Sequence, residues 1–138
     1  MTDVFASDKR SWIMSRVKSR NTKPERIVRS VLHRMGYRFR LCGDDLPGKP
    51  DIVFPGRRKV IFVNGCFWHG HTCRRGKRVP STNRDYWLAK IQANVRRDRS
   101  HRSRLAHAGW RSLTVWECQL ADLDRLARRM DEFLADSR

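Results

Sequence analysis

The sequence predicts an α/β fold in which a small mixed sheet is flanked by helices. Residues 51–54, 60–63 and 110–116 are short runs with the apolar content or alternation typical of strands. Segments in which apolar residues recur at helical spacing lie before, between and after these runs. The chain has 138 residues, 39% of them hydrophobic, which fits one domain with a core and excludes a wholly disordered basic protein.

The first helix is expected to begin at Thr22. Thr22 suits the N-cap, Pro24 is tolerated in the first turn, and Glu25 falls at the third helical position of a capping box. Apolar residues follow at helical spacing as far as Gly36, which favours a helix end. The capping box is sufficient to explain Glu25 without any part in catalysis.

Three strands are expected after this helix. Residues 37–41 alternate apolar and basic side chains, which is typical of a half-buried strand. Residues 51–54 form a short apolar strand, after which Pro55 and Gly56 turn the chain. Residues 60–63 are continuously apolar and are therefore expected at the centre of the sheet.

The second half of the chain predicts two more helices and a fourth strand. Apolar residues at helical spacing over residues 84–105 indicate a long helix that Gly109 stops. Residues 110–116 alternate as a strand, and residues 120–133 form a final amphipathic helix. The other face of the long helix is expected to hold its basic residues: Arg84, Lys90, Arg96, Arg97, Arg99, Arg102 and Arg104.

The charge balance points to a polyanionic partner. Lys and Arg number 31 against 14 Asp and Glu, a formal charge of +17, and 24 of the 31 are Arg. The guanidinium group matches phosphate oxygens bidentately, so the balance favours nucleic acid. A membrane surface is disfavoured because the basic residues are not confined to one amphipathic helix. No apolar run approaches the roughly 20 residues of a membrane span, and no signal peptide follows Met1. We therefore expect no membrane partner and a cytoplasmic protein.

The chain is expected to consist of a basic N-terminal arm, residues 1–20, and a single domain, residues 21–138. The arm has too few apolar residues to predict a packed helix. Its basic residues surround Trp12, Ile13 and Met14, and they are Lys9, Arg10, Arg16, Lys18 and Arg20.

Cysteine and histidine residues predict a metal site in the long loop at 64–81. Cys66, His71 and Cys73 lie within eight residues, and Cys118 follows the last strand. Three Cys and one His are a common donor set for structural zinc, which would tie the loop to the strand end. Disulfides are not expected in a cytosolic protein. The alternatives are free thiols beside a surface histidine, or His69 in place of His71 as the ligand.

A second candidate site involves a carboxylate and a histidine. Asp51 opens the second strand and Asn64 closes the third, so a hairpin between these strands brings Asp51 near Val63 and the loop that carries His69. A carboxylate at a sheet end can hold Mg²⁺, and a nearby histidine can deprotonate a water that attacks phosphorus. The alternatives are a turn role for Asp51 after a proline, and a zinc-ligand or solvent-facing role for His69.

Two adjacent aromatic residues, Phe67 and Trp68, lie between expected metal ligands. Neighbouring side chains point opposite ways in extended backbone, so burial of both in one small core is awkward. In a basic protein they can form a wedge that unstacks base pairs, with Met14 of the arm joining them. Equally, one ring can pack on the sheet while the other shields the metal.

Together these motifs resemble the very short patch repair (Vsr) endonucleases, over a span from about Arg10 to about Phe133. The Gly-Cys-Phe-Trp-His run at 65–69, in front of His71 and Cys73, is highly specific for that family. The other matching motifs are Phe39-Arg40, Leu46-Pro-Gly-Lys-Pro-Asp51, Val60-Ile-Phe62, Trp87-Leu-x-Lys-Ile91, Asn94-Val-x-Arg-Asp98 and Val115-Trp-Glu-Cys118.

The resemblance implies a restriction-endonuclease-like fold of the PD-(D/E)XK type and a nick 5′ to the thymine of a T:G mismatch. It makes Asp51 a Mg²⁺ ligand together with the backbone carbonyl of Val63, and it makes His69 the general base. Glu25 would support the site from the first helix. The matching structural zinc ligands are Cys66, His71, Cys73 and Cys118, which favours His71 over His69.

The resemblance also implies that Phe67, Trp68 and Met14 insert beside the mismatch while the arm wraps the opposite groove. The family usually acts on the deamination product of 5-methylcytosine, so the expected partner is duplex DNA with a T:G mismatch in a bacterial nucleoid. Mismatch-repair proteins and a DNA polymerase are further expected partners, and a monomer is expected. The arm residues expected on DNA are Trp12, Lys18 and Arg20.

One position departs from the family, because its best-studied members carry Thr-His where this chain has Val63-Asn64. A contact through the backbone carbonyl survives the change at Val63, and Asn64 can hydrogen-bond a water of the metal. We therefore expect activity with an altered rate or pH response. The alternatives are a zinc-stapled mismatch-binding protein with an inactive nuclease site, and a sequence-tolerant DNA nuclease.

Overall fold

The computed structural model describes residues 22–41, 43–74, 76–77 and 79–135. One mixed sheet has the strand order β1-β2-β3-β4. The pairs β1–β2 and β2–β3 are antiparallel, whereas β3–β4 is parallel. The predicted mixed sheet is confirmed, with β3 inside it. The strands are β1 (Arg40–Leu41), β2 (Ile52–Phe54), β3 (Lys59–Asn64) and β4 (Arg111–Trp116).

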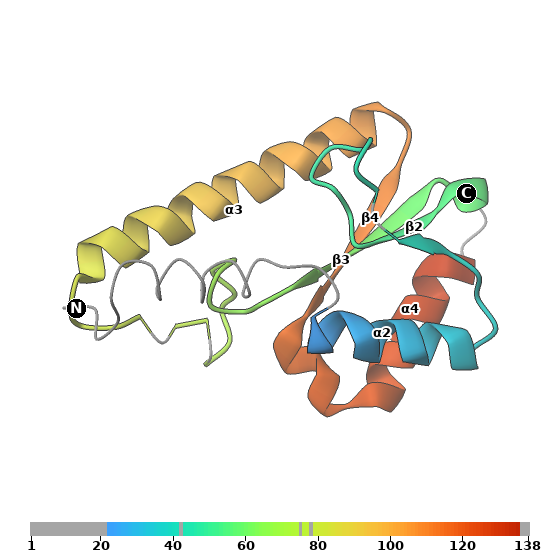
Figure 1. The fold of residues 1–138 in the computed structure, drawn as a ribbon, viewed down its shortest axis with the longest axis horizontal. Helices are drawn as coiled ribbons and strands as arrows, with labels where there is room; N and C mark the ends of the chain where they lie inside the picture. Colours follow the sequence, from blue (N-terminus) through green and yellow to red (C-terminus); the bar gives the residue numbers. More distant parts are fainter. Residues whose placement is uncertain (1–21, 42, 75, 78, 136–138) are drawn as a thin grey trace.

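Helices cover both faces of this sheet (Figure 1). The helices α2 (Lys23–Arg34) and α4 (Leu123–Ala135) lie side by side on one face, and α3 (Arg84–His107) runs across the other. The first half of α3 projects beyond the sheet, alongside the loop that follows β3 (Figure 1). No helix among the described residues is both long and apolar enough to cross a membrane.

The alternation of side chains in β2 and β3 builds two separate cores. Ile52 and Ile61 are fully buried against α2 and α4, in one cluster with Val115 of β4. Val53 and Val60 point to the opposite face, where they pack against Leu105 of α3. Successive residues of a strand face opposite sides, so the short apolar runs supply both cores at once.

The expected start of the first helix is confirmed. The Thr22 side chain accepts a hydrogen bond from the Glu25 backbone N–H at 3.4 Å, so Thr22 is the N-cap of α2. Gly36 follows the helix with φ of +88°, a left-handed conformation that glycine adopts without strain. This cap places Glu25 at the end of α2 that faces the candidate site.

The strand expected over residues 37–41 is wrong in length, because only Arg40–Leu41 pairs with β2. Tyr37 is instead tied back to α2, since its N–H donates to the carbonyl of Leu32 at 3.1 Å. The Phe39 ring stacks on His33 with centroids 4.7 Å apart and meets Phe54 edge-on at 6.0 Å. These aromatic contacts bring the segment onto the α2 side of the core.

The last helix begins later than residue 120. Residues Glu117–Ala121 form a 3-10 helix, η2, and α4 starts at Leu123. Asp122 explains the boundary, since its Oδ1 accepts the N–H of Arg125 at 3.1 Å as an N-cap does. The turn made by η2 carries Cys118 back toward the loop after β3.

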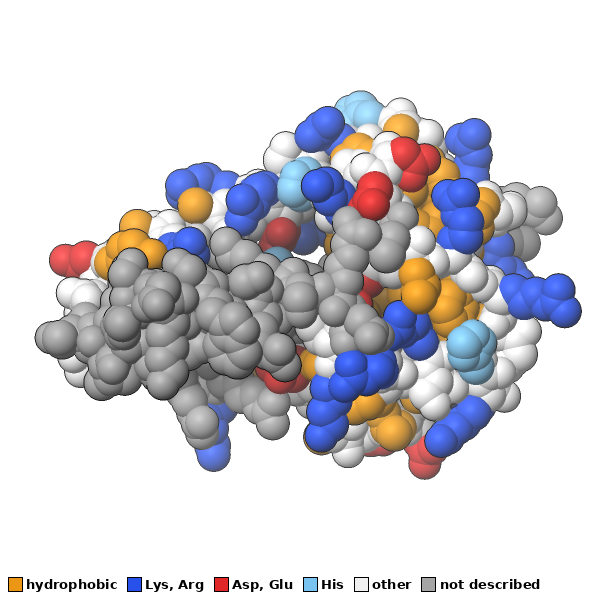
Figure 2. All heavy atoms as spheres, in the orientation of Figure 1, with side chains coloured by type: hydrophobic (Ala, Val, Ile, Leu, Met, Phe, Trp, Pro, Cys, Tyr) orange, Lys and Arg blue, Asp and Glu red, His pale blue; other side chains and the backbone are white. Residues whose placement is uncertain are grey.

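The basic residues of α3 do not share one face, contrary to expectation. Lys90 and Arg97 line the large cavity beside the end of β3, whereas the exposed Arg96, Arg99 and Arg104 are not among its lining residues. Figure 2 shows Lys and Arg side chains spread widely over the visible surface, with few acidic groups between them. Basic side chains therefore lie both on the visible face of the molecule and in the cavity.

Candidate active site and metal centre

A cavity of about 1030 Å³ lies between the start of α2, the end of β3, the loop at 65–69 and one face of α3. It is lined by both acids and bases. The carboxylates on its wall are Glu25, Asp51, Asp98 and Glu117, and the basic side chains are Lys49, His69, Lys90 and Arg97. Such a combination can hold a cation and a phosphate in the same space.

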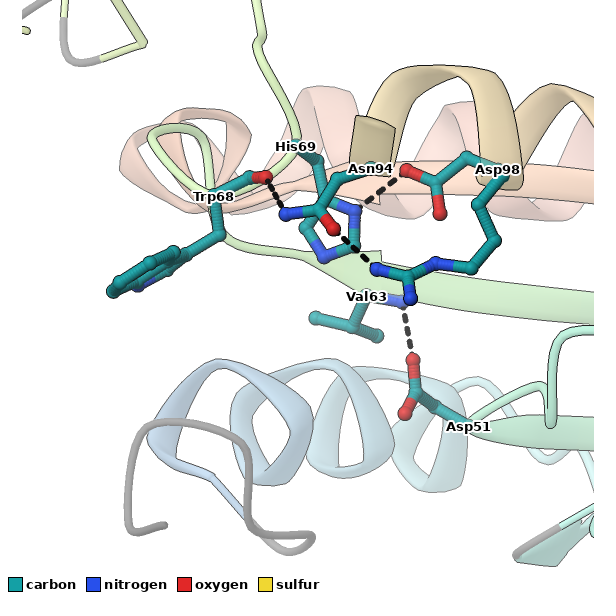
Figure 3. A network of polar contacts seen from close by, with 7 residues as sticks. Asp51, Val63, Trp68, His69, Asn94 and Asp98 are labelled. Atoms are coloured by element: carbon teal, nitrogen blue, oxygen red, sulfur yellow. Dashed lines mark hydrogen bonds and ion pairs between the residues drawn. The ribbon is translucent and has the colours of Figure 1, made fainter. Parts of the chain in front are cut away.

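Asp51 is fixed at the end of β3, as the hairpin prediction required. Ile52 pairs with Ile61, so the residue before β2 lies beside the last part of β3. The Val63 backbone N–H donates a 2.7 Å hydrogen bond to Asp51 Oδ2 (Figure 3). A half-buried carboxylate held in this way is preorganised on the cavity wall.

Asn64 follows on the same strand and also lines the cavity. Its side chain is 7% exposed, and its backbone pairs with Trp116 of β4. Asn64 therefore lies one residue beyond the backbone that holds Asp51. An amide at this position can donate and accept a hydrogen bond but cannot act as a base at neutral pH.

His69 pairs with a residue that sequence reasoning did not assign to the site. Its Nδ1 lies 2.6 Å from Oδ2 of Asp98, and the two side chains are 30% and 21% exposed (Figure 3). A carboxylate at Nδ1 orients the imidazole and leaves Nε2 as the nitrogen that can take a proton. Asp98 stood in the matching Asn94–Asp98 motif, and its helical spacing from Asn94 was the available signal.

Asn94 is a further residue that the prediction missed. Its Nδ2 donates a 2.8 Å hydrogen bond to the backbone carbonyl of Trp68, and its Oδ1 accepts one from Arg97. Asn94 and Asp98 are one helical turn apart and hold two consecutive residues of the loop, Trp68 and His69. The loop is therefore seated on α3 by polar contacts.

Phe67 and Trp68 do not point in opposite directions, because the backbone here is a turn. The Gly70 N–H donates to the Phe67 carbonyl at 3.3 Å. The two rings meet edge-to-face with centroids 5.1 Å apart, and Trp87 of α3 lies 5.8 and 5.7 Å from them. Tyr86, 58% exposed, extends this aromatic cluster outward.

The arm residues assigned to DNA lie outside the described residues. Trp12, Met14, Lys18 and Arg20 are all in the segment before residue 22. Their expected contacts with DNA stay predictions, as does the division of the chain into an arm and a domain.

The four predicted ligands of a structural metal come together. One ligand atom each from Cys66, His71, Cys73 and Cys118 lies within 4.8 Å of the others. His71 Nδ1 is 3.6 Å from the Cys118 sulfur, and the Cys118 N–H donates to the Cys66 sulfur at 3.3 Å. This Cys₃His set can hold a tetrahedrally coordinated metal ion. His69, the alternative ligand, pairs with Asp98 instead.

The cysteines of the cluster differ in their acidity. Burial raises the pKa of the Cys66 thiol to about 12. Desolvation also raises the pKa of Cys73, but hydrogen bonds from the Gly76 N–H, His71 and the other thiols outweigh it and lower that pKa to about 6. The His71 ring stacks on Trp116 with centroids 4.2 Å apart, which fixes its orientation. One thiolate is thus already favoured beside a positioned imidazole.

Comparison with known proteins places the chain among DNA endonucleases. The family model described as DNA mismatch endonuclease Vsr matches residues 2–75. The type II nicking enzyme V.XorIIP of Xanthomonas oryzae pv. oryzae is 53% identical over 137 residues, which cover 99% of this chain and 100% of that protein. The DNA mismatch endonuclease Vsr of Escherichia coli is 44% identical over 136 residues, which cover 99% of this chain and 85% of that protein.

A third relative, the type II nicking enzyme V.NmeAIP of Neisseria meningitidis, is 40% identical over 139 residues, which cover 96% of this chain and 99% of that protein. These similarities extend through the sheet, the cavity and the Cys₃His cluster. The predicted restriction-endonuclease-like fold agrees with the mixed sheet between two helical layers. The chain therefore belongs to the Vsr family of DNA mismatch endonucleases.

Proposed function

We propose that this protein is a DNA mismatch endonuclease that nicks duplex DNA 5′ to the thymine of a T:G mismatch. The nick would start very short patch repair of deaminated 5-methylcytosine. The observation that carries the proposal is that the Asp51 carboxylate and the His69–Asp98 pair face one cavity beside an aromatic cluster. The names of the relatives, a mismatch endonuclease and nicking enzymes, support the same activity.

The carboxylate side of the cavity fits Mg²⁺. Asp51 and the backbone carbonyl of Val63 would hold the ion, and the room around them suits a cation that retains several waters. Bound Mg²⁺ would polarise the phosphate and favour ionisation of the attacking water. Asn64 and Glu25, which also line the cavity, would hydrogen-bond and position water there.

His69 would act as the general base. With Nδ1 held by Asp98, Nε2 can take a proton from the water that attacks phosphorus. Asp98 would stabilise the imidazolium that results, as a carboxylate behind a catalytic histidine does. Lys49, Lys90 and Arg97 would offset the charge of the DNA phosphates in the same cavity.

The aromatic cluster would supply recognition of the defect. Phe67 and Trp68 lie on the loop that leads directly into His69. Insertion of a side-chain wedge costs less where the base pair is already weakened, so a wedge favours a mismatch over matched duplex. Met14 of the arm would join them from the other side of the DNA.

We assign zinc to the Cys₃His cluster. Three thiolates and one imidazole are a typical donor set for structural Zn²⁺, and all four protein ligands together leave no open position for catalysis. The ion would tie the loop after β3 to η2 and so stabilise the part of the chain that carries Trp68 and His69. Its role would be structural.

We also propose a cellular location and partner proteins for this endonuclease. It would act as a monomer on DNA in the bacterial cytoplasm and nucleoid, without a membrane partner. Mismatch-repair proteins and a DNA polymerase would act on the nicked product. The bacterial relatives that carry DNA endonuclease names support this setting.

Asn64 supports a second candidate, a mismatch-binding protein with an inactive nuclease site. It stands on the cavity wall where the best-studied members of the family carry histidine, and an amide cannot replace a base. This candidate predicts mismatch-dependent affinity without strand scission at any Mg²⁺ or Mn²⁺ concentration.

Nicking of an end-labelled T:G duplex by the wild type and by Asp51→Ala distinguishes the two candidates. The nuclease proposal predicts Mg²⁺-dependent scission of the T strand by the wild type and none by the variant, while both bind the duplex. Equal inertness of the two proteins on every mismatch would refute the nuclease, and mismatch-dependent binding would then identify the binding protein.

A further inference from the structure

We propose that Asn94 is a positioning residue that couples the position of the Trp68 side chain to that of His69. Its amide ties the Trp68 peptide to α3, so that insertion of the indole at a mismatch sets the imidazole for reaction. This inference rests on the proposed function. It assigns to Asn94 a part in discrimination that acts through the protein rather than through the DNA bases.

The coupling begins with two hydrogen bonds from one face of α3. Asn94 Nδ2 donates to the Trp68 carbonyl at 2.8 Å, and Asp98 Oδ2 lies 2.6 Å from Nδ1 of His69. Residues four apart on a helix are neighbours on its surface. Two adjacent residues of the loop are therefore held by two adjacent residues of the helix (Figure 3).

The next residue of the loop, Gly70, lies close against α3. It has φ of +66°, and a Cβ atom built on it would lie 2.9 Å from the Cγ2 atoms of both Ile91 and Val95. The backbone thus rests directly on α3 at the residue after His69. Since this close approach limits movement of the loop toward the helix, a rotation of the Trp68 peptide would displace His69.

The Asn94 amide forms hydrogen bonds at both its oxygen and its nitrogen. Its Oδ1 accepts a hydrogen bond from Arg97, and this leaves the Nδ2 group directed at the Trp68 carbonyl. The donor and the acceptor of this amide therefore both have partners. The amide is therefore a defined link between helix and loop.

Trp68 belongs to two networks at once. Its carbonyl points into the polar network, whereas its indole points away from it (Figure 3). The indole packs edge-to-face on Phe67 and Trp87, with centroids 5.1 and 5.7 Å away. Insertion of the indole into DNA would change these ring contacts. The Trp68–His69 peptide would transmit that change to His69, and the Asn94 hydrogen bond sets the position of this peptide on α3.

A double-mutant cycle between Asn94→Asp and Trp68→Ala tests the inference. Aspartate keeps the shape and an acceptor for Arg97 but loses the donor to the Trp68 carbonyl. We expect the single-turnover nicking rate on T:G duplex to fall roughly 10- to 100-fold, because a small misplacement of a reacting group costs about that much. In the Trp68→Ala background the same change should alter the rate less than about twofold, since no indole remains to be sensed.

Two control variants test whether the change in rate is specific to the Asn94 hydrogen bond. Gln92→Glu makes the same amide-to-acid change on an exposed position of α3 and should leave the rate unchanged. Asn94→Ser, which is too short to reach the carbonyl and adds no charge, should give the same non-additive result if the aspartate variant folds poorly. Melting temperature and metal content are measured for every protein.

An equal loss of rate in both backgrounds would overturn the inference, since it would show that Asn94 acts through the fold or directly on DNA. An unchanged rate for both Asn94 variants would overturn it as well. In either case the wild type still nicks, so the proposed function stands. A wild type that nicks no mismatch refutes the proposed function and the inference together.

Discussion

The 2.6 Å contact between His69 and Asp98 joins residues that are 29 positions apart in the chain. The sequence placed His69 in a reactive loop but offered two other interpretations for it, a zinc ligand and a surface residue. The structure distinguishes these interpretations, because His71 lies with the cysteines and His69 lies with Asp98. The Asn94–Asp98 motif pointed to Asp98, but its pairing with His69 was not predictable, because the approach of α3 to the loop depends on tertiary packing.

Asp98→Asn should lower the single-turnover nicking rate by roughly 10²–10⁴-fold, the range that general-base catalysis usually supplies. An amide can donate to Nδ1 and so favours the tautomer in which Nε2 carries the proton and is unable to accept one. The measurement is nicking of a T:G duplex at saturating protein.

Asp85→Asn is the matched control, because Asp85 is an exposed acid in the first turn of the same helix. Its rate should equal that of the wild type. A rate for Asp98→Asn within about twofold of the wild type would show that the carboxylate does not orient the base.

At the level of elements, most helices and strands follow from local patterns. The Thr22 cap, the apolar run that became β3 and the glycine after α3 were each readable in a few neighbouring residues. The short β1 was not, because residues 37–39 are drawn into aromatic contacts with α2 and β2. The start of α4 was misplaced although Asp122, a good N-cap, marked it in the sequence.

A buried lysine connects β3 to the end of α4. Lys59 is 1% exposed, its Nζ donates to the Phe133 carbonyl at 2.5 Å, and it lies 5.3 Å from the centre of the Phe133 ring. Arg57 donates to the next carbonyl, that of Leu134, at 2.8 Å. These donors satisfy carbonyl groups that every helix leaves unpaired at its C-terminus.

Lys59→Met should lower the free energy of unfolding by about 1–3 kcal/mol, because it leaves a helix-end carbonyl without its charged donor. Chemical denaturation measures the change. Lys23→Met, at an exposed position, should stay within about 0.5 kcal/mol of the wild type. Equal effects of the two changes would mean that the contact contributes nothing to stability.

The Cys₃His cluster connects two elements, since its residues lie in the loop after β3 and in η2. Cys73→Ser should lower metal content and thermal stability together. A loss of about 2 kcal/mol would lower Tm by roughly 5–10 °C in a domain of this size. Metal analysis with a thermal melt tests this, and Cys42→Ser controls for loss of a thiol. Full metal content in Cys73→Ser would refute its role as a ligand.

At the scale of the whole molecule, part of the formal charge of +17 is carried by basic residues that line the cavity. Basic side chains are spread over the visible face (Figure 2). Lys49, Lys90 and Arg97 also line the cavity that holds the carboxylates. The composition alone predicted a polyanion as partner. The cavity adds an acid, a paired histidine and aromatic rings in one place, which supports the proposed partner, duplex DNA with a local defect.

A cleavage panel tests whether the protein nicks duplex DNA at T:G mismatches. Every single mismatch and the matched T:A duplex, each set in randomised flanks and labelled on both strands, is incubated with the wild type and Mg²⁺ under single-turnover conditions. We expect scission of one strand, 5′ to the thymine of T:G, at a rate about 100-fold higher than on matched duplex. This ratio corresponds to a difference in activation free energy of roughly 2.8 kcal/mol. Equal rates on matched and mismatched duplexes, or mismatch-dependent binding with no scission, would contradict this expectation.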